Sequence, residues 1–576
     1  MWITENTDYS ENVASTFLLS AWHELFEGFT PDSFQPRLHN VPSLVEELVD
    51  LSRLWKGEVR MAPHIEKVQS ELNLMVRSAD DILCRIPEYR TRVNRLFEAS
   101  SADTIIAGGE ILIEKRNLYW NAFEANSGDA IANLPRGKKA AMSAIRGLAT
   151  FAFQQGKEDD DLWDPMPKDA ARSPDSIFRD MINLTQKGDQ EFLCTLSIIG
   201  SIDEMHSLVR KKGHEVMSHD SLPKHYRDEL TAPRHQTLHV RMSVTERSIR
   251  HAVAKARKQL EGMIGFVSMY TNPASLRLHS KALVSHQNED RIFVQTEQAF
   301  RRLFPRSNAR RDIKEVIELT STHPLDRRIL AAIEQLAIAS GSADTRTRLV
   351  SLWASIETLA GAHEGKTILE RVCELLTPLV ISRHVHRTTR YLTILIQRFS
   401  QQTGKANFGS GFNPNNRNLA SQEDMLVTLT SECNGRKMLD LLGFADHPLL
   451  RFRLYETWET LHDPRKLSSR LKASKQRLEW QIARIYRARN RLVHDGEEVR
   501  FTVPLLDNLQ NYLSMLVQRI IHELKRHPNW SLRHLIEYWN GRMSHAIDCL
   551  DKCPSAINCR DFLERGDATP LWTGYV

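Results

Sequence analysis

The chain has 576 residues, of which 41% are hydrophobic and 26% are charged, and this composition is typical of a globular protein. The length is too great for a single hydrophobic core and predicts about three or four domains. A net charge of +5 is small for 66.3 kDa, so the charge total alone does not indicate a nucleic-acid partner.

Other features argue against a secreted or membrane protein. The seven cysteines are too few and too scattered for a disulfide framework. The longest apolar stretches, such as 192–199 and 513–521, are shorter than the roughly 20 residues of a membrane-spanning helix. The first residues are polar and acidic, unlike a secretory signal. We therefore expect a cytoplasmic protein with no membrane partner.

Residues 1–160 are predicted to form a helical amino-terminal region. Between Val41 and Trp55 the apolar residues recur at helical spacing, and Ser43 with Glu46 matches a capping box. A run of acids followed by prolines at 157–176 indicates a linker or an exposed loop. A helical segment is expected at 177–232.

Residues 235–300 are predicted to form a small α/β unit. The stretch 237–244 alternates between apolar and polar residues like a strand, and a helix is expected at 245–270. Two more strands are expected at 276–284 and 291–295.

A concentrated basic stretch follows this unit. It either contacts the phosphates of a nucleic acid or forms a solvated linker face. Its candidate RNA-binding residues are Arg301, Arg302, Arg306, Arg310 and Arg311.

Residues 320–530 are predicted to form a helical bundle. Helices are expected at 326–340 and 344–362, with Asp344 as the N-cap of the second. A long helical stretch at 366–402 and a loop at 403–424 precede two late helices. These late helices are expected at 464–494 and 504–525. The whole chain is thus predicted to be mainly α.

The carboxy-terminal tail, 531–576, contains four residues that are candidate zinc ligands. Their spacing suits a tetrahedral site, although there is no CxxC knuckle. A helix that buries small cysteines would produce the same spacing. The four residues are His545, Cys549, Cys553 and Cys559. No cofactor is otherwise expected.

The segment YRARNRLVHDG, residues 486–496, ends one of the late helices and holds the candidate catalytic residues. His494 titrates near neutral pH and can transfer a proton during RNA cleavage. Arg489 offers a planar cation for the phosphate, and Asn490 can hydrogen-bond the phosphate or orient the histidine. Gly496 suits a helix end. By itself the same pattern also describes an ordinary polar helix end.

The motif of an arginine, four residues and a histidine occurs again from Arg234 to His239. The second copy leads into a predicted strand and has no asparagine after the arginine. We interpret it as a chance occurrence.

The late region resembles the HEPN family, whose signature is an arginine, a polar residue and a following histidine near the end of a helix in a four-helix bundle. RNRLVH at 489–494 matches this signature, and LVSLWASIETLAG at 349–361 resembles a preceding helix in the bacterial ApeA-like HEPN group. The resemblance covers about 235–527. It implies that Arg489 and His494 are catalytic, with Asn490 as the polar residue. Glu357 is a weaker candidate, equally explained as a structural acid.

The resemblance implies a metal-independent endoribonuclease that cleaves RNA through attack of the ribose 2′-hydroxyl, in bacterial anti-phage defence or a stress response. Family members often form homodimers, so a homodimer or a higher homo-oligomer is expected. The large amino-terminal part suggests a phage-derived trigger or a regulatory partner. The alternative is a non-catalytic HEPN scaffold that binds RNA, a nucleotide or a protein partner.

Overall fold

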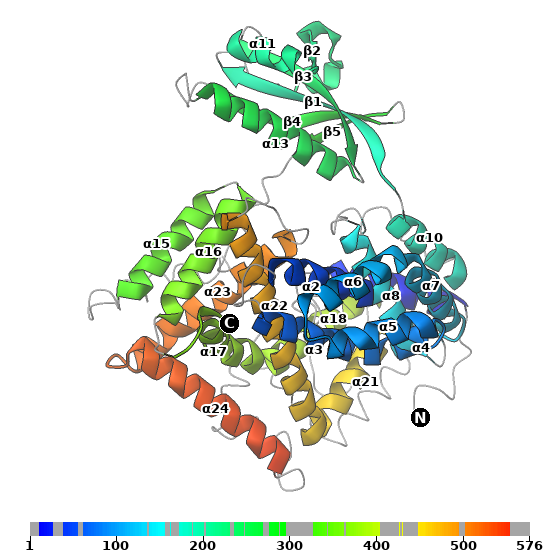
Figure 1. The fold of residues 1–576 in the computed structure, drawn as a ribbon, viewed down its shortest axis with the longest axis vertical. Coiled ribbons are helices and arrows are strands. Elements are labelled where there is room, and N and C mark those ends of the chain that lie inside the picture. The colour runs from blue at the N-terminus through cyan, green and yellow to red at the C-terminus, as the bar shows by residue number, and fades with distance from the viewer. Residues whose placement is uncertain are drawn as a thin grey trace. The chain divides into compact units, whose positions relative to one another are not determined.

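The protein is described by a computed structural model that covers most of the chain. The described residues are 11–26, 39–55, 62–134, 137–155, 162, 172–186, 188–200, 203–230, 236–246, 248–268, 276–286, 289–294, 327–342, 344–361, 365–403, 426, 429, 447–494 and 502–552. They are mainly helical, with a five-stranded antiparallel sheet in the middle region (Figure 1). None of the described helices combines the length and the apolarity needed to cross a lipid bilayer.

The chain divides into two compact units, which we call the helical unit and the sheet unit. The helical unit comprises residues 1–154, 163–182 and 303–576, and the sheet unit comprises 155–162 and 183–302. Residues 1–160 and 320–530 are predicted from the sequence as separate domains, whereas the structure places their described helices in one compact unit. Their contacts join residues that are hundreds of positions apart, which local sequence patterns do not reveal.

The sheet unit contains the five strands that the structure describes. Its elements in chain order are β1 (Gln190–Gly200), α11 (Asp203–Lys211), β2 (Glu215–Met217), η2 (His219–Ser221), α12 (Lys224–Arg227), β3 (Thr237–Glu246), α13 (Ile249–Ser268), β4 (Leu276–His286) and β5 (Glu289–Val294). The strand order is β2-β3-β1-β4-β5, and every neighbouring pair is antiparallel. From β1 to β4, the order of strands and long helices is that of a ferredoxin-like unit, with β5 added at one edge.

Helices α11 and α13 cover one face of this sheet (Figure 1). Leu196 and Ile198 of β1 pack beneath them in an apolar core. The connection between β2 and β3 lies on the other face, where Tyr226 is buried and its hydroxyl lies 3.2 Å from Ser197 Oγ. Both faces of β1 are therefore covered.

The prediction of a helical segment at 177–232 was wrong for part of its length, because β1 and β2 lie within it. β1 is the middle strand and is buried on both faces over most of its length. A strand buried on both faces has a continuous apolar run instead of an alternating one, and periodicity cannot distinguish such a run from a buried helix.

The amino-terminal part of the helical unit is a set of packed helices. They are α1 (Glu11–Phe26), α2 (Val41–Trp55), α3 (Ala62–Ser78), α4 (Asp80–Leu83), α5 (Pro87–Glu98), α6 (Ala102–Glu114), α7 (Arg116–Ala132) and α8 (Lys138–Gln154), and α10 (Pro174–Gln186) follows. The capping box of α2 lies one turn earlier than predicted. Asn40 Oδ1 accepts from Ser43 N at 3.0 Å, and Asn40 N donates to Ser43 Oγ at 2.9 Å. Ser43 therefore lies inside the helix, and Asn40 is its cap.

The carboxy-terminal part contains the late helices. They are α15 (Arg327–Gly341), α16 (Thr345–Ala360), α17 (Ile368–Ser382), α18 (His384–Thr403), α21 (Pro448–His462), α22 (Pro464–His494), α23 (Thr502–Arg526) and α24 (Leu532–Lys552). The predicted N-cap of α16 is confirmed, because Asp344 Oδ2 accepts from Thr347 N at 2.9 Å. The predicted helical stretch at 366–402 consists of two helices that meet at Arg383.

Helices α16, α17, α22 and α23 form a four-helix bundle, in which each helix contacts the other three. Trp353 of α16 and Tyr512 of α23 are buried in its core. Helix α24 packs against α17 and α22, so the first part of the predicted tail belongs to the helical unit. This bundle positions the end of α22, where the candidate motif lies.

Candidate functional site

The candidate motif begins in the last turns of α22. Ile485 and Ala488 face the core of the bundle and are buried, whereas Arg489 and Asn490 are partly exposed. Arg489 Nη1 donates a hydrogen bond to Asn490 Oδ1 over 3.0 Å. Asn490 therefore orients the arginine, whereas the sequence predicts that it binds the phosphate or orients the histidine.

The guanidinium of Arg489 keeps unused hydrogen-bond donors. Its Nε is shielded from solvent and has no hydrogen-bond partner among the described residues. Arginine carries five N–H donors in a fixed plane, and only Nη1 is occupied by Asn490. Because Nε is buried, the donors left for a phosphate oxygen are the hydrogens of Nη2 and the second hydrogen of Nη1.

The histidine of the motif is the last residue of α22. The position of the His494 side chain lies outside the description, as do residues 495–501. Its juxtaposition with Arg489 therefore stays a prediction.

Glu357 lies on α16, in the same bundle, and is partly exposed. Its backbone carbonyl accepts from Gly361 N at 3.1 Å at the end of that helix. Within the part of the chain that the structure describes, no hydrogen bond or ion pair joins its side chain to Arg489. The structure thus brings together Arg489 and Asn490 but does not link them to Glu357.

The remaining predicted binding residues are described only in part. Residues 301–311, with the five arginines, lie outside the described ranges, as do Cys553 and Cys559. On α24, Cys549 Sγ lies 3.5 Å from His545 Nε2. The described residues contain no group of three or more His, Cys, Asp or Glu side chains placed to hold a metal ion. The zinc site therefore stays a prediction.

The second copy of the motif ends inside the sheet unit. His239 lies on β3 and is buried, with Nδ1 2.8 Å from Ser197 Oγ and Nε2 3.2 Å from His219 Nδ1. Burial lowers the pKa of His239 to about 4, so the ring is neutral at physiological pH.

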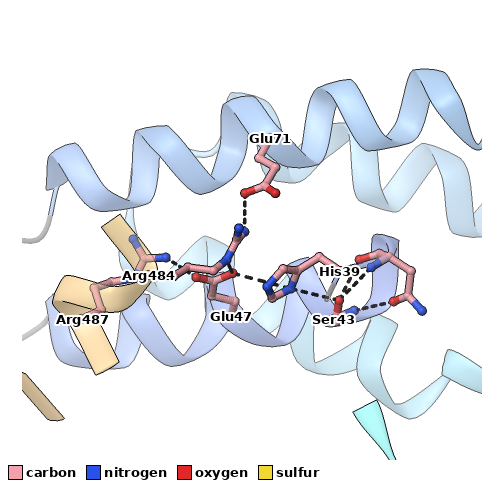
Figure 2. A network of polar contacts seen from close by, with 7 residues as sticks. His39, Ser43, Glu47, Glu71, Arg484 and Arg487 are labelled. Atoms are coloured by element: carbon pink, nitrogen blue, oxygen red, sulfur yellow. Dashed lines mark hydrogen bonds and ion pairs between the residues drawn. The ribbon is translucent and has the colours of Figure 1, made fainter. Parts of the chain in front are cut away.

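Just before the motif, α22 carries two arginines that bind acids of the amino-terminal helices (Figure 2). Arg484 Nε donates to Glu47 Oε2 of α2 at 3.1 Å, and Arg484 Nη2 donates to Glu71 Oε2 of α3. Arg487 Nη2 donates to the other oxygen of Glu47. One carboxylate thus bridges two arginines. We call Glu47, Glu71, Arg484 and Arg487 the α22 clamp.

The side chains of the α22 clamp are largely buried from solvent. The side chain of Arg484 is 6% exposed, and that of Glu71 is 10% exposed. Burial raises the pKa of the Glu47 carboxyl, but the charges of Arg484 and Arg487 outweigh burial and hold that pKa below its ordinary value. Glu47 is therefore ionised over the physiological range and attracts both guanidinium groups.

A neutral histidine completes this network (Figure 2). His39 Nδ1 lies 3.3 Å from Ser43 Oγ and 3.9 Å from Glu47 Oε2. Burial, assisted by the nearby charge of Arg484, lowers the pKa of His39 to about 3. The histidine therefore contributes no charge to the network at neutral pH.

Tyr486, which lies between Arg484 and Arg487 in the sequence, makes two aromatic contacts. The ring of Tyr486 stacks on His64 of α3 at 5.8 Å and lies 5.6 Å from the ring of Trp353 on α16. The turn of α22 before Arg489 is thus held by α2, α3 and α16.

The α22 clamp is not predicted from the sequence. Arg484 and Arg487 are three residues apart, so the sequence alone indicates that they lie on one face of α22, beside its core positions. Their partners are more than 400 positions away in the sequence, and no local pattern indicates them.

Comparison of the chain with protein-family models, with curated proteins and with solved structures gave no match.

Proposed function

We propose that this chain is a metal-independent endoribonuclease of the HEPN type that acts in the cytoplasm, in bacterial anti-phage defence or a stress response. The observation that carries the proposal is the Arg489–Asn490 pair. It lies at the end of a helix in a four-helix bundle, is partly exposed, and has guanidinium donors that no described residue occupies. A cation in this state can bind the phosphate of an RNA chain.

In the proposed reaction, the ribose 2′-oxygen forms a bond to phosphorus while the bond from phosphorus to the 5′-oxygen breaks. The 2′-hydroxyl loses a proton and the departing 5′-oxygen gains one, which leaves a 2′,3′-cyclic phosphate and a 5′-hydroxyl. His494 moves these protons. Arg489 neutralises the charge that grows on the phosphate, and Asn490 holds the arginine in place. Glu357 remains a weaker catalytic candidate.

The proposal includes partners. We expect a homodimer or a higher homo-oligomer, in which two copies of the motif form one cleft for RNA. Arg301, Arg302, Arg306, Arg310 and Arg311 would contribute phosphate contacts. A phage-derived trigger or a regulatory partner would control the activity.

The test is RNA cleavage by the purified full-length protein in the presence of EDTA. We expect His494→Ala and Arg489→Ala each to lower the rate by about 1000-fold, because both residues act in one transition state. Product ends should carry a 2′,3′-cyclic phosphate.

Arg491→Ala is the matched control, because Arg491 is a partly exposed arginine two positions further along the same helix. It should keep its rate within about threefold of the wild-type rate. Wild-type protein that cleaves no RNA, or cleavage that survives His494→Ala, would contradict the proposal. In that case the non-catalytic scaffold becomes the better explanation.

A further inference from the structure

The α22 clamp determines which side of α22 Arg489 faces. Successive residues of an α-helix are about 100° apart, so Arg489 lies about 140° around the axis from Arg484 and about 160° from Arg487. With both clamp arginines bound to α2 and α3, Arg489 is directed to the far side of α22. A rotation of α22 that redirected Arg489 would remove both guanidinium groups from Glu47.

The α22 clamp is better explained as a constraint on the rotation of α22 than as a source of folding stability. A buried ion pair contributes little net stability compared with apolar residues of the same volume, because both charges lose their water. Here the arrangement also leaves Arg484 Nη1 buried, with no hydrogen-bond partner among the described residues. What such a network supplies is a defined geometry, since Arg484 and Arg487 can share the two oxygens of Glu47 in only one arrangement.

We infer that Glu47 of α2, assisted by Glu71 of α3, is a positioning residue for the motif at the end of α22. Glu47 does not contact the substrate. It fixes the rotation of α22 through Arg484 and Arg487 and thereby directs Arg489. The amino-terminal helices are then a working part of the nuclease. This inference rests on the proposed function for its cleavage assay and on the clamp geometry for a second measurement.

The test compares Glu47→Asp with the wild-type full-length protein. Aspartate keeps the charge but is one methylene shorter, so it cannot hold both arginines in the same place. A displacement of about 1 Å in a catalytic group can lower the rate about 100-fold. We expect kcat on an RNA oligonucleotide to fall by about that factor, with KM changed much less, because the main role of Arg489 is to neutralise the charge that grows on the phosphate in the transition state.

Glu24→Asp provides a matched control. Glu24 on α1 binds Arg453 on α21, with the Nε–Oε1 distance at 2.9 Å, and both side chains are buried. This pair also joins an amino-terminal helix to a carboxy-terminal one, but it does not involve α22. We expect Glu24→Asp to lower the melting temperature as Glu47→Asp does and to keep kcat. A normal kcat in Glu47→Asp, or an equal loss in both variants, overturns the inference.

Hydrogen–deuterium exchange separates this inference from the proposed function. The backbone amides of residues 488–494 should exchange faster in Glu47→Asp than in wild type or Glu24→Asp. If the wild-type protein cleaves no RNA, the proposed function is wrong, and the exchange rates alone decide the positioning inference. Unchanged exchange at 488–494 in Glu47→Asp would overturn it.

Discussion

Asn490 influences which hydrogen-bond donors of Arg489 are occupied. The amide oxygen of Asn490 accepts from Nη1 of the guanidinium and leaves the Nη2 hydrogens without a partner among the described residues. Arg484 and Arg487, on the same helix, differ from Arg489 because each donates to a carboxylate in a largely buried environment. The same residue type therefore serves as an anchor at two positions and as the candidate phosphate-binding group at a third.

The neutral state of His39 predicts a loss of stability in acid. The folded pKa is about 3 and the unfolded one is 6.5, so below pH 6.5 the unfolded chain binds a proton that the folded chain does not. Stability therefore falls as the pH drops from 6.5 towards 3, by about 2 kcal/mol at about pH 5. Protonation of Glu47 adds to this loss below its ordinary pKa of 4.5.

The measurement is the free energy of unfolding at about pH 7.5 and about pH 5, for wild type and His39→Gln. Glutamine cannot take up the proton, so its loss on acidification should be smaller by about 2 kcal/mol. An identical pH dependence in the two proteins would show that His39 is not buried in its neutral form.

At the scale of elements, close approach between helices depends on where small residues lie. Gly147 of α8 faces the ring of Phe123 on α7, and a Cβ at position 147 would overlap that ring. Gly128, also on α7, has no heavy atom within 4 Å of the place where a Cβ would stand. Both glycines are inside helices, so they differ only in their surroundings.

We therefore expect the same substitution to act with opposite sign at these two positions. Gly147→Ala should lower the free energy of unfolding by about 1–3 kcal/mol, because the ring must move. Gly128→Ala should raise it by about 0.5–1 kcal/mol, because alanine favours the helix. Urea denaturation of the two variants provides the measurement. A stabilising Gly147→Ala would mean that α7 and α8 are not packed this closely.

At the scale of the molecule, buried ion pairs join amino-terminal helices to carboxy-terminal helices within the helical unit. Glu24 binds Arg453, and Tyr391 donates a hydrogen bond to the same carboxylate, so α1, α18 and α21 meet at one acid. Together with the α22 clamp, this makes the amino-terminal helices part of the same packed structure as the bundle.

Removal of the acid should destabilise the helical unit as a whole. Glu24→Ala leaves Arg453 buried without its main partner, at a cost of about 3 kcal/mol. Native-state hydrogen exchange should then show a common increase in α1, α18, α21 and the bundle helices, with β1 and β3 of the sheet unit unchanged. Faster exchange confined to the amino-terminal helices would contradict a single cooperative unit.

The sequence alone determined the features that depend on neighbouring residues. The bounds of α22, the cap at Asp344 and the strand β3 follow from periodicity and from side chains within a few positions of each other. The location of Arg489 and Asn490 at a helix end was predictable for the same reason. Only the tertiary structure decided that β1 is a central strand, that Asn490 binds Arg489, and that Glu47 binds two arginines of α22. Burial on both faces, side-chain direction and the pairing of distant charges arise from packing in three dimensions, and local sequence patterns do not encode them.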